Sequence, residues 1–175
     1  MIGFSLVSLA ALLLSNLTGG TSNRLVFSVY RSAISPLFIL RLFCHVLGHS
    51  SFTHYVTNIA LILSLGPIVE ERWGSIRVLI MFAITAVISA LFHLVFGASN
   101  TMLLGASGIV YMLIFLASTA GTSRGEIPIT LIAVCALYIT QEVTAGLFSA
   151  DNISHMTHIV GGLCGAFMGL FLHKS

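Results

Sequence analysis

Six apolar stretches divide the chain, and each approaches the roughly 20 residues that an α-helix needs to cross a bilayer. They lie near residues 2–18, 52–69, 76–97, 102–120, 127–148 and 153–172. Hydrocarbon offers no hydrogen bonds to the backbone, so such stretches are stable there as helices that satisfy their own polar groups. The pattern therefore predicts an all-α polytopic membrane protein, a single domain over residues 1–175 built from six helices.

Composition supports this class and limits the partners. Apolar residues make up 57% of the 175 residues and charged residues 7%, with a mean hydropathy of +1.07. Seven Lys and Arg give a formal net charge of +2, too little for the basic patch that a phosphate backbone requires. We therefore expect the lipid bilayer, and no nucleic acid, as a partner. The three cysteines form no CxxC pair and are interpreted as small buried hydrophobes.

The long connection over residues 19–51 is not plainly polar, because residues 37–43 are apolar around Arg41. It is predicted to be an interfacial, partly helical hairpin, with a seventh span as the alternative. Six spans put both termini on one side. Cytoplasmic termini place four basic residues inside and three outside. These are Arg72, Arg77, Arg124 and Lys174, against Arg24, Arg31 and Arg41.

Polar residues of three spans are predicted to lie at one depth. The second, fourth and sixth spans enter from the same side. His54 and Asn58 lie near the start of the second, Ser107 about five residues into the fourth and His158 about five into the sixth. At 1.5 Å per residue, each lies roughly 8 Å below one surface. Ionisable groups in hydrocarbon are costly, so we interpret this level as a functional site.

Ser107 and His158 form the minimum pair for nucleophilic catalysis, because a serine hydroxyl needs a neighbouring base to take its proton. No Asp or Glu lies at that level in the three spans, and Asp151 is interpreted as a helix cap. A dyad is therefore predicted rather than a triad. His54, Asn58 and the backbone N–H of Ser107 are predicted to stabilise the oxyanion.

Glycines are predicted to bring the pair together. They recur every four residues on the sixth span and flank the serine on the fourth, at Gly161, Gly165 and Gly169 and at Gly105 and Gly108. Small residues at this spacing let two helices approach closely in lipid. Such an approach would bring Ser107 Oγ within hydrogen-bond reach of the His158 ring. The alternative interpretation is ordinary packing of membrane helices.

Taken in order, these motifs resemble the rhomboid family of intramembrane serine proteases, from about Arg41 to Gly169. The matching segments are His49-xxxx-His54-xxx-Asn58, Glu70-Glu71-Arg72-Trp73-Gly74, Gly105-Ala106-Ser107-Gly108 and His158-xx-Gly161-xxx-Gly165. Leu40-Arg41 stands where the family often has Trp-Arg, so the cation is kept and the aromatic ring is not.

The resemblance implies a serine endopeptidase that hydrolyses other membrane proteins within or beside their transmembrane segments, without a metal or cofactor. Ser107 would be the nucleophile and His158 the general base and then acid. A substrate helix must unwind to expose its peptide bond, and the fifth span with the loop capping the site is the expected gate. We expect an integral protein of the bacterial plasma (inner) membrane, with its site open to the outer face.

Two other functions remain open at this point. A metal transporter would coordinate its cargo with histidines: His45, His49, His54, His155 and His158. A non-catalytic binding or quality-control scaffold would have no use for the serine. Replacing Ser107 by Ala separates the three functions. Glu142 and Gln141, near the end of the fifth span, are predicted to hydrogen-bond within the bundle or to line a cavity.

Overall fold

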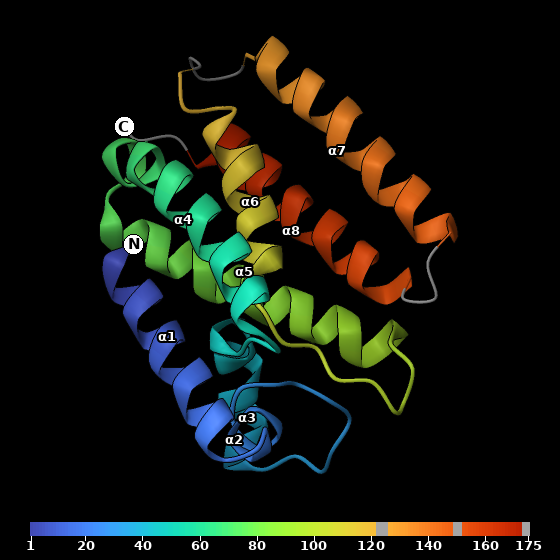
Figure 1. Cartoon of the computed structure of the whole chain (residues 1–175). Coiled ribbons are helices and arrows are strands. Elements are labelled where there is room, and N and C mark those ends of the chain that lie inside the picture. The colour runs from blue at the N-terminus through green and yellow to red at the C-terminus, as the bar shows by residue number, and fades with distance from the viewer. Residues whose placement is uncertain (122–125, 149–151, 173–175) are drawn as a thin grey trace.

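A computed structural model describes residues 1–121, 126–148 and 152–172, which include eight α-helices and one 3₁₀ turn (Figure 1). In chain order these are α1 (Ile2–Leu17), α2 (Thr21–Leu25), α3 (Pro36–Cys44), η1 (His45–Leu47), α4 (Phe52–Trp73), α5 (Ser75–Phe96), α6 (Ser107–Ala117), α7 (Ile129–Phe148) and α8 (Asn152–Phe171). The described part contains no strand, only an isolated bridge between Val29 and Leu103. The all-α prediction is confirmed. Asp151, Arg124 and Lys174 lie outside the described residues.

Two of the predicted spans, α4 and α5, are each 22 residues long and apolar enough to cross a bilayer. The outer side of α5 carries exposed apolar side chains at Ile76, Leu79, Ile80 and Val95. Such a continuous apolar surface suits contact with lipid. The other long helices fall at the predicted stretches, but their apolar segments among the described residues are 10–17 residues long, so the count of six crossings stays a prediction.

The fourth predicted span begins later than expected. Residues 97–106 are not helical: Leu103 pairs with Val29 through two backbone hydrogen bonds of 2.9 Å, and the N–H of Gly105 donates to the His45 carbonyl. Gly105 has φ +121°, which a helix does not tolerate. Ser107 is therefore the first residue of α6, and the prediction that it lies about five residues into a helix was wrong.

Helix α6 is the centre of the bundle, packed against α4, α5 and α8. In Figure 1 it lies between α4 and α8, with α1 and α7 at opposite edges of the molecule. Most of its 11 residues are apolar and buried. The first residue of such an enclosed helix is fixed by packing on several sides.

Glycines put α6 and α8 in backbone contact. A Cβ added to Gly161 would lie 2.9 Å from the carbonyl carbon of Gly108, and one added to Gly165 would lie equally close to that of Met112. Real Cβ atoms do not approach backbone so closely. Gly105 has a different role, because an added Cβ there would meet the His54 ring.

The connection before α4 is held by side-chain to backbone contacts, with α2 and α3 at one end of the molecule (Figure 1). Buried Arg41 donates to the Leu25 carbonyl at 2.8 Å and lies over the Tyr30 ring. His45 bonds the Ala86 carbonyl at 3.0 Å, and burial lowers its pKa to about 4. This partly helical arrangement agrees with the prediction. The apolar segment Pro36–Leu47 is shorter than the roughly 20 residues of a full crossing.

Candidate active site

The His158 ring is held against α6 by Tyr111. Tyr111 lies one helical turn after Ser107, and the His158 ring stacks on its ring with centroids 4.6 Å apart and planes 7° apart. Thr157, the neighbour of His158, lines the same small cavity as Ser107. The structure therefore brings the predicted serine and the predicted histidine to the same end of α6.

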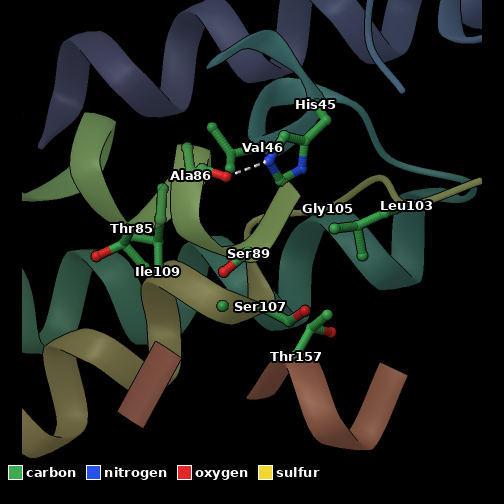
Figure 2. A pocket seen from close by; sticks show the side chains of 11 residues that line it. His45, Val46, Thr85, Ala86, Ser89, Leu103, Gly105, Ser107, Ile109 and Thr157 are labelled. Carbon is green, nitrogen blue, oxygen red and sulfur yellow. Dashed lines mark hydrogen bonds between the residues drawn. The ribbon is translucent and has the colours of Figure 1, made fainter. Parts of the chain in front are cut away.

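That cavity lies between the start of α6, α5 and the connection before α4 (Figure 2). Polar side chains of Ser107, Ser89, Thr157 and His45 are among its lining. Ser89 Oγ and His45 Nδ1 are buried and have no hydrogen-bond partner within the described residues. The space suits about one water molecule, the reactant that any hydrolysis consumes.

His54 and Asn58 approach Gly105, two residues before Ser107. They lie four residues apart on α4, on one face. The position of a Cβ on Gly105 would be 2.8 Å from His54 Nε2 and 4.0 Å from Asn58 Nδ2. Both the positive φ and this close approach require glycine here. The polar ends of His54 and Asn58 thus meet next to the start of α6.

The side chains of His54 and Asn58 can both donate a hydrogen bond. Asn58 is only 5% exposed, yet its Nδ2 has no hydrogen-bond partner in the described part of the chain. A buried donor left unpaired costs free energy, so its presence calls for an explanation. His54 Nδ1 lies 3.2 Å from Ser50 Oγ, and a hydroxyl that donates to Nδ1 leaves the ring proton on Nε2, the nitrogen near Gly105. Two converging donors of this kind suit a developing oxyanion.

Glu142 of α7 is the polar side chain that sequence reasoning did not assign to the site. Its Oε2 lies 2.7 Å from His155 Nδ1 and 3.1 Å from His158 Nδ1, and its Oε1 accepts the Tyr111 hydroxyl. The carboxylate is buried, with 5% of the residue exposed. The prediction of a dyad considered only the carboxylates of the second, fourth and sixth spans, and Glu142 lies on the fifth.

The predicted depth of Glu142 along the fifth span is a sequence signal that could have identified it as a site residue. In the predicted six-span arrangement the fifth span runs opposite to its neighbours, so its end is expected at the surface where the even-numbered spans begin. Glu142 precedes Phe148, the last residue of α7, by six positions, or roughly 9 Å along the helix axis. That depth matches the level predicted for Ser107 and His158. The relevant signal was an acidic residue at a matching height in an apolar helix.

The same cluster is the group in the described chain whose spacing would also suit a metal ion. One donor atom each from Glu142, His155 and His158 lies within 4.8 Å of the others. Two imidazole N–H groups directed at one carboxylate account for the same distances without a cation. A carboxylate shared between two rings is therefore compatible with the observed contacts.

His45 and His49, by contrast, are structural in this fold. His45 bonds the α5 backbone, and fully buried His49 lies 3.2 Å from both Ser8 Oγ and the Leu47 carbonyl through its Nδ1. The His49 ring also packs edge-on against His54 at 4.9 Å between centroids. His49 thus helps to position His54, one of the two converging donors.

Comparison with known proteins agrees with these motifs. The Rhomboid domain family matches residues 36–175. The chain is 29% identical over 140 residues to the putative rhomboid protease YdcA of Bacillus subtilis, covering 75% of this chain and 66% of that protein. It is 28% identical over 135 residues to the rhomboid protease GlpG of Salmonella newport and of Salmonella typhi, covering 74% of this chain and 48% of each relative.

The chain thus spans about half to two thirds of the length of the curated relatives that it matches. The matched region begins at α3 and includes every residue of the candidate site. Its apolar helices and this match make it an integral membrane protein. The chain belongs to the rhomboid family.

Proposed function

We propose that this chain is an intramembrane serine protease, which hydrolyses peptide bonds within or next to the transmembrane segments of other membrane proteins. One observation carries the proposal: Asn58 presents a buried, unpaired amide donor beside the helix start that bears Ser107, where His158 is also held. A binding scaffold or a transporter has no need for that combination. The relatives' own names, rhomboid protease, support the same activity.

In the proposed mechanism Ser107 Oγ attacks the scissile carbonyl carbon while its proton passes to His158. The electron pair of the C=O bond moves to the oxygen, which is stabilised by His54, Asn58 and the Ser107 backbone N–H. Collapse of this intermediate expels the amine, which takes the proton from His158 and leaves an acyl enzyme. Water then repeats the sequence, and His158 returns its proton to Ser107.

The proposed membrane arrangement has six crossings, formed by α1, α4, α5, α6, α7 and α8. The termini are cytoplasmic and the site opens to the outer face of a bacterial plasma membrane. Short α6 then begins below the surface, because 11 residues extend only about 16 Å. This depth favours substrates whose helix unwinds locally, since a helical peptide bond is shielded and already hydrogen-bonded. The fifth crossing, α7, is the proposed gate.

The test uses the full chain purified in detergent with a generic single-span membrane protein as substrate. Wild type should cleave the substrate, and its serine should be labelled by a fluorophosphonate. Ser107→Ala should lose cleavage and labelling, and His158→Ala should lose both by several orders of magnitude. Labelling that survives in Ser107→Ala would overturn the assignment of the nucleophile.

A matched control is Ser64→Ala. Ser64 is an exposed serine of α4 whose hydroxyl bonds the Ala60 carbonyl within its own helix. Its removal should leave cleavage and labelling unchanged. Substrate that binds to wild type and to Ser107→Ala alike, without being cleaved by either, would favour a non-catalytic scaffold.

A further inference from the structure

We propose that Glu142 is a positioning residue for His158, so that this chain works with a carboxylate, a histidine and a serine rather than with a serine–histidine pair alone. The inference rests on the proposed function and deepens it. It starts from the 3.1 Å contact between Glu142 Oε2 and His158 Nδ1.

A carboxylate at this place needs an explanation. Glu142 is buried in a largely apolar helix, where an ionised group is costly unless it is fully hydrogen-bonded. Its three partners come from two other helices: Tyr111 from α6, and His155 and His158 from α8. The contacts thus hold one carboxylate in a defined orientation between three helices.

These contacts fix the His158 ring in two ways. Stacking on Tyr111 sets the plane of the ring, and the bond to Glu142 sets its rotation within that plane. A carboxylate accepts, so Nδ1 carries the proton and Nε2 carries the lone pair. Nε2 is then the nitrogen that takes the Ser107 proton. Without the carboxylate, the opposite tautomer would present an N–H to the serine and could not act as a base.

Charge gives a second effect during the reaction. When the Ser107 proton moves to Nε2, His158 becomes a cation while the oxygen of the substrate becomes an anion. Glu142 faces that cation and keeps its own negative charge, since Nδ1 retains its proton throughout. The lower the local dielectric, the larger this stabilisation becomes. The other titratable groups around the cluster are His155, Tyr111, Tyr138 of α7 and His54 of α4.

The central variant is Glu142→Gln, which keeps the size of the side chain and removes its charge. We expect kcat to fall by about 10²- to 10⁴-fold, because neither the Nδ1–H tautomer of His158 nor its protonated form would then face a carboxylate. KM should stay within about twofold of the wild-type value, because the substrate contacts remain. The rate of fluorophosphonate labelling of Ser107 should fall in parallel. Gln141→Ala, at the exposed neighbouring position, is the matched control and should change neither constant.

Glu142→Asp is the second variant, because it keeps the charge and withdraws it by one methylene. Its kcat should lie about tenfold below that of wild type and above that of the glutamine variant, with KM unchanged. This variant also tests the inference by itself if Glu142→Gln does not fold, as judged by its melting temperature. An aspartate variant with wild-type kcat would overturn the inference.

Three results would assign Glu142 another role. A change confined to KM in Glu142→Gln would mean that the side chain holds α7 in place for substrate entry. Unchanged kcat would mean that the contact is structural. Activity lost with EDTA and restored by Zn²⁺ would make the carboxylate a metal ligand. Each leaves the protease assignment intact, which fails only if Ser107→Ala still cleaves.

Discussion

Gly161→Ala tests whether the close contact of α6 and α8 sets the geometry of the site. Gly161 lies one turn after His158, and its added Cβ would be 2.9 Å from the carbonyl carbon and 3.0 Å from the Cα of Gly108. Carbon atoms pack best at about 3.5–4.0 Å, so α8 must move away from α6 by about 1 Å. Neither atom of Gly108 can yield alone, because both belong to the helix backbone.

The displacement acts directly on the reacting groups. Gly108 follows Ser107, and Gly161 is on the same helix as His158, so the separation of Ser107 and His158 grows with that of the helices. A misplacement of about 1 Å costs on the order of 10²-fold in rate. Overpacking of this kind also destabilises the fold by about 1–3 kcal/mol. We expect kcat of Gly161→Ala to fall about 10²-fold, with a measurable loss of melting temperature.

The assay compares kcat on a single-span substrate in detergent with the melting temperature of each variant. Gly169→Ala is the matched control: its added Cβ would meet the side chain of Thr119, two residues beyond the end of α6, about 16 Å along the α8 axis from His158. It should lose stability and keep its kcat. Wild-type kcat in Gly161→Ala, or an equal loss in both variants, would refute the reasoning.

Three shorter predictions concern single contacts. Asn58→Ala should lower kcat about 10²- to 10³-fold with little change in melting temperature, because its Nδ2 is unpaired in the fold; a loss below fivefold would exclude it as an oxyanion donor. The melting temperature should fall as the pH drops from 6.5 to 4, because burial lowers the folded-state pKa of His45 to about 4 and the unfolded chain binds the extra proton in that window; an equally steep fall in His45→Asn would contradict this origin. Trp73→Phe removes the 2.8 Å bond from Nε1 to the Leu172 carbonyl and should cost about 1 kcal/mol in denaturant unfolding while cleavage is unchanged; lost cleavage would connect the far end of α8 to the site.

Several residues of the candidate site could be predicted from the sequence because they recur at helical spacings. The interval from His54 to Asn58 is one turn, and the glycines from Gly161 onward follow the same period, so their faces could be assigned before any tertiary contact was known. The start of α6 could not be found this way. Residues 102–106 are as apolar as a helix would be, and only pairing with Val29 and the His45 carbonyl makes them extended.

The sequence alone indicated the class of this protein and its family, through the order of the polar motifs along its apolar segments. Polar residues within hydrocarbon are costly, so the few that this chain contains indicate a function. The tertiary structure alone decided which groups surround His158. Tyr111 and Glu142 lie 31 residues apart and meet only because α7 packs beside α6 and α8. Contacts between helices depend on the shapes of whole helix faces, and the hydropathy pattern of the sequence does not predict those contacts.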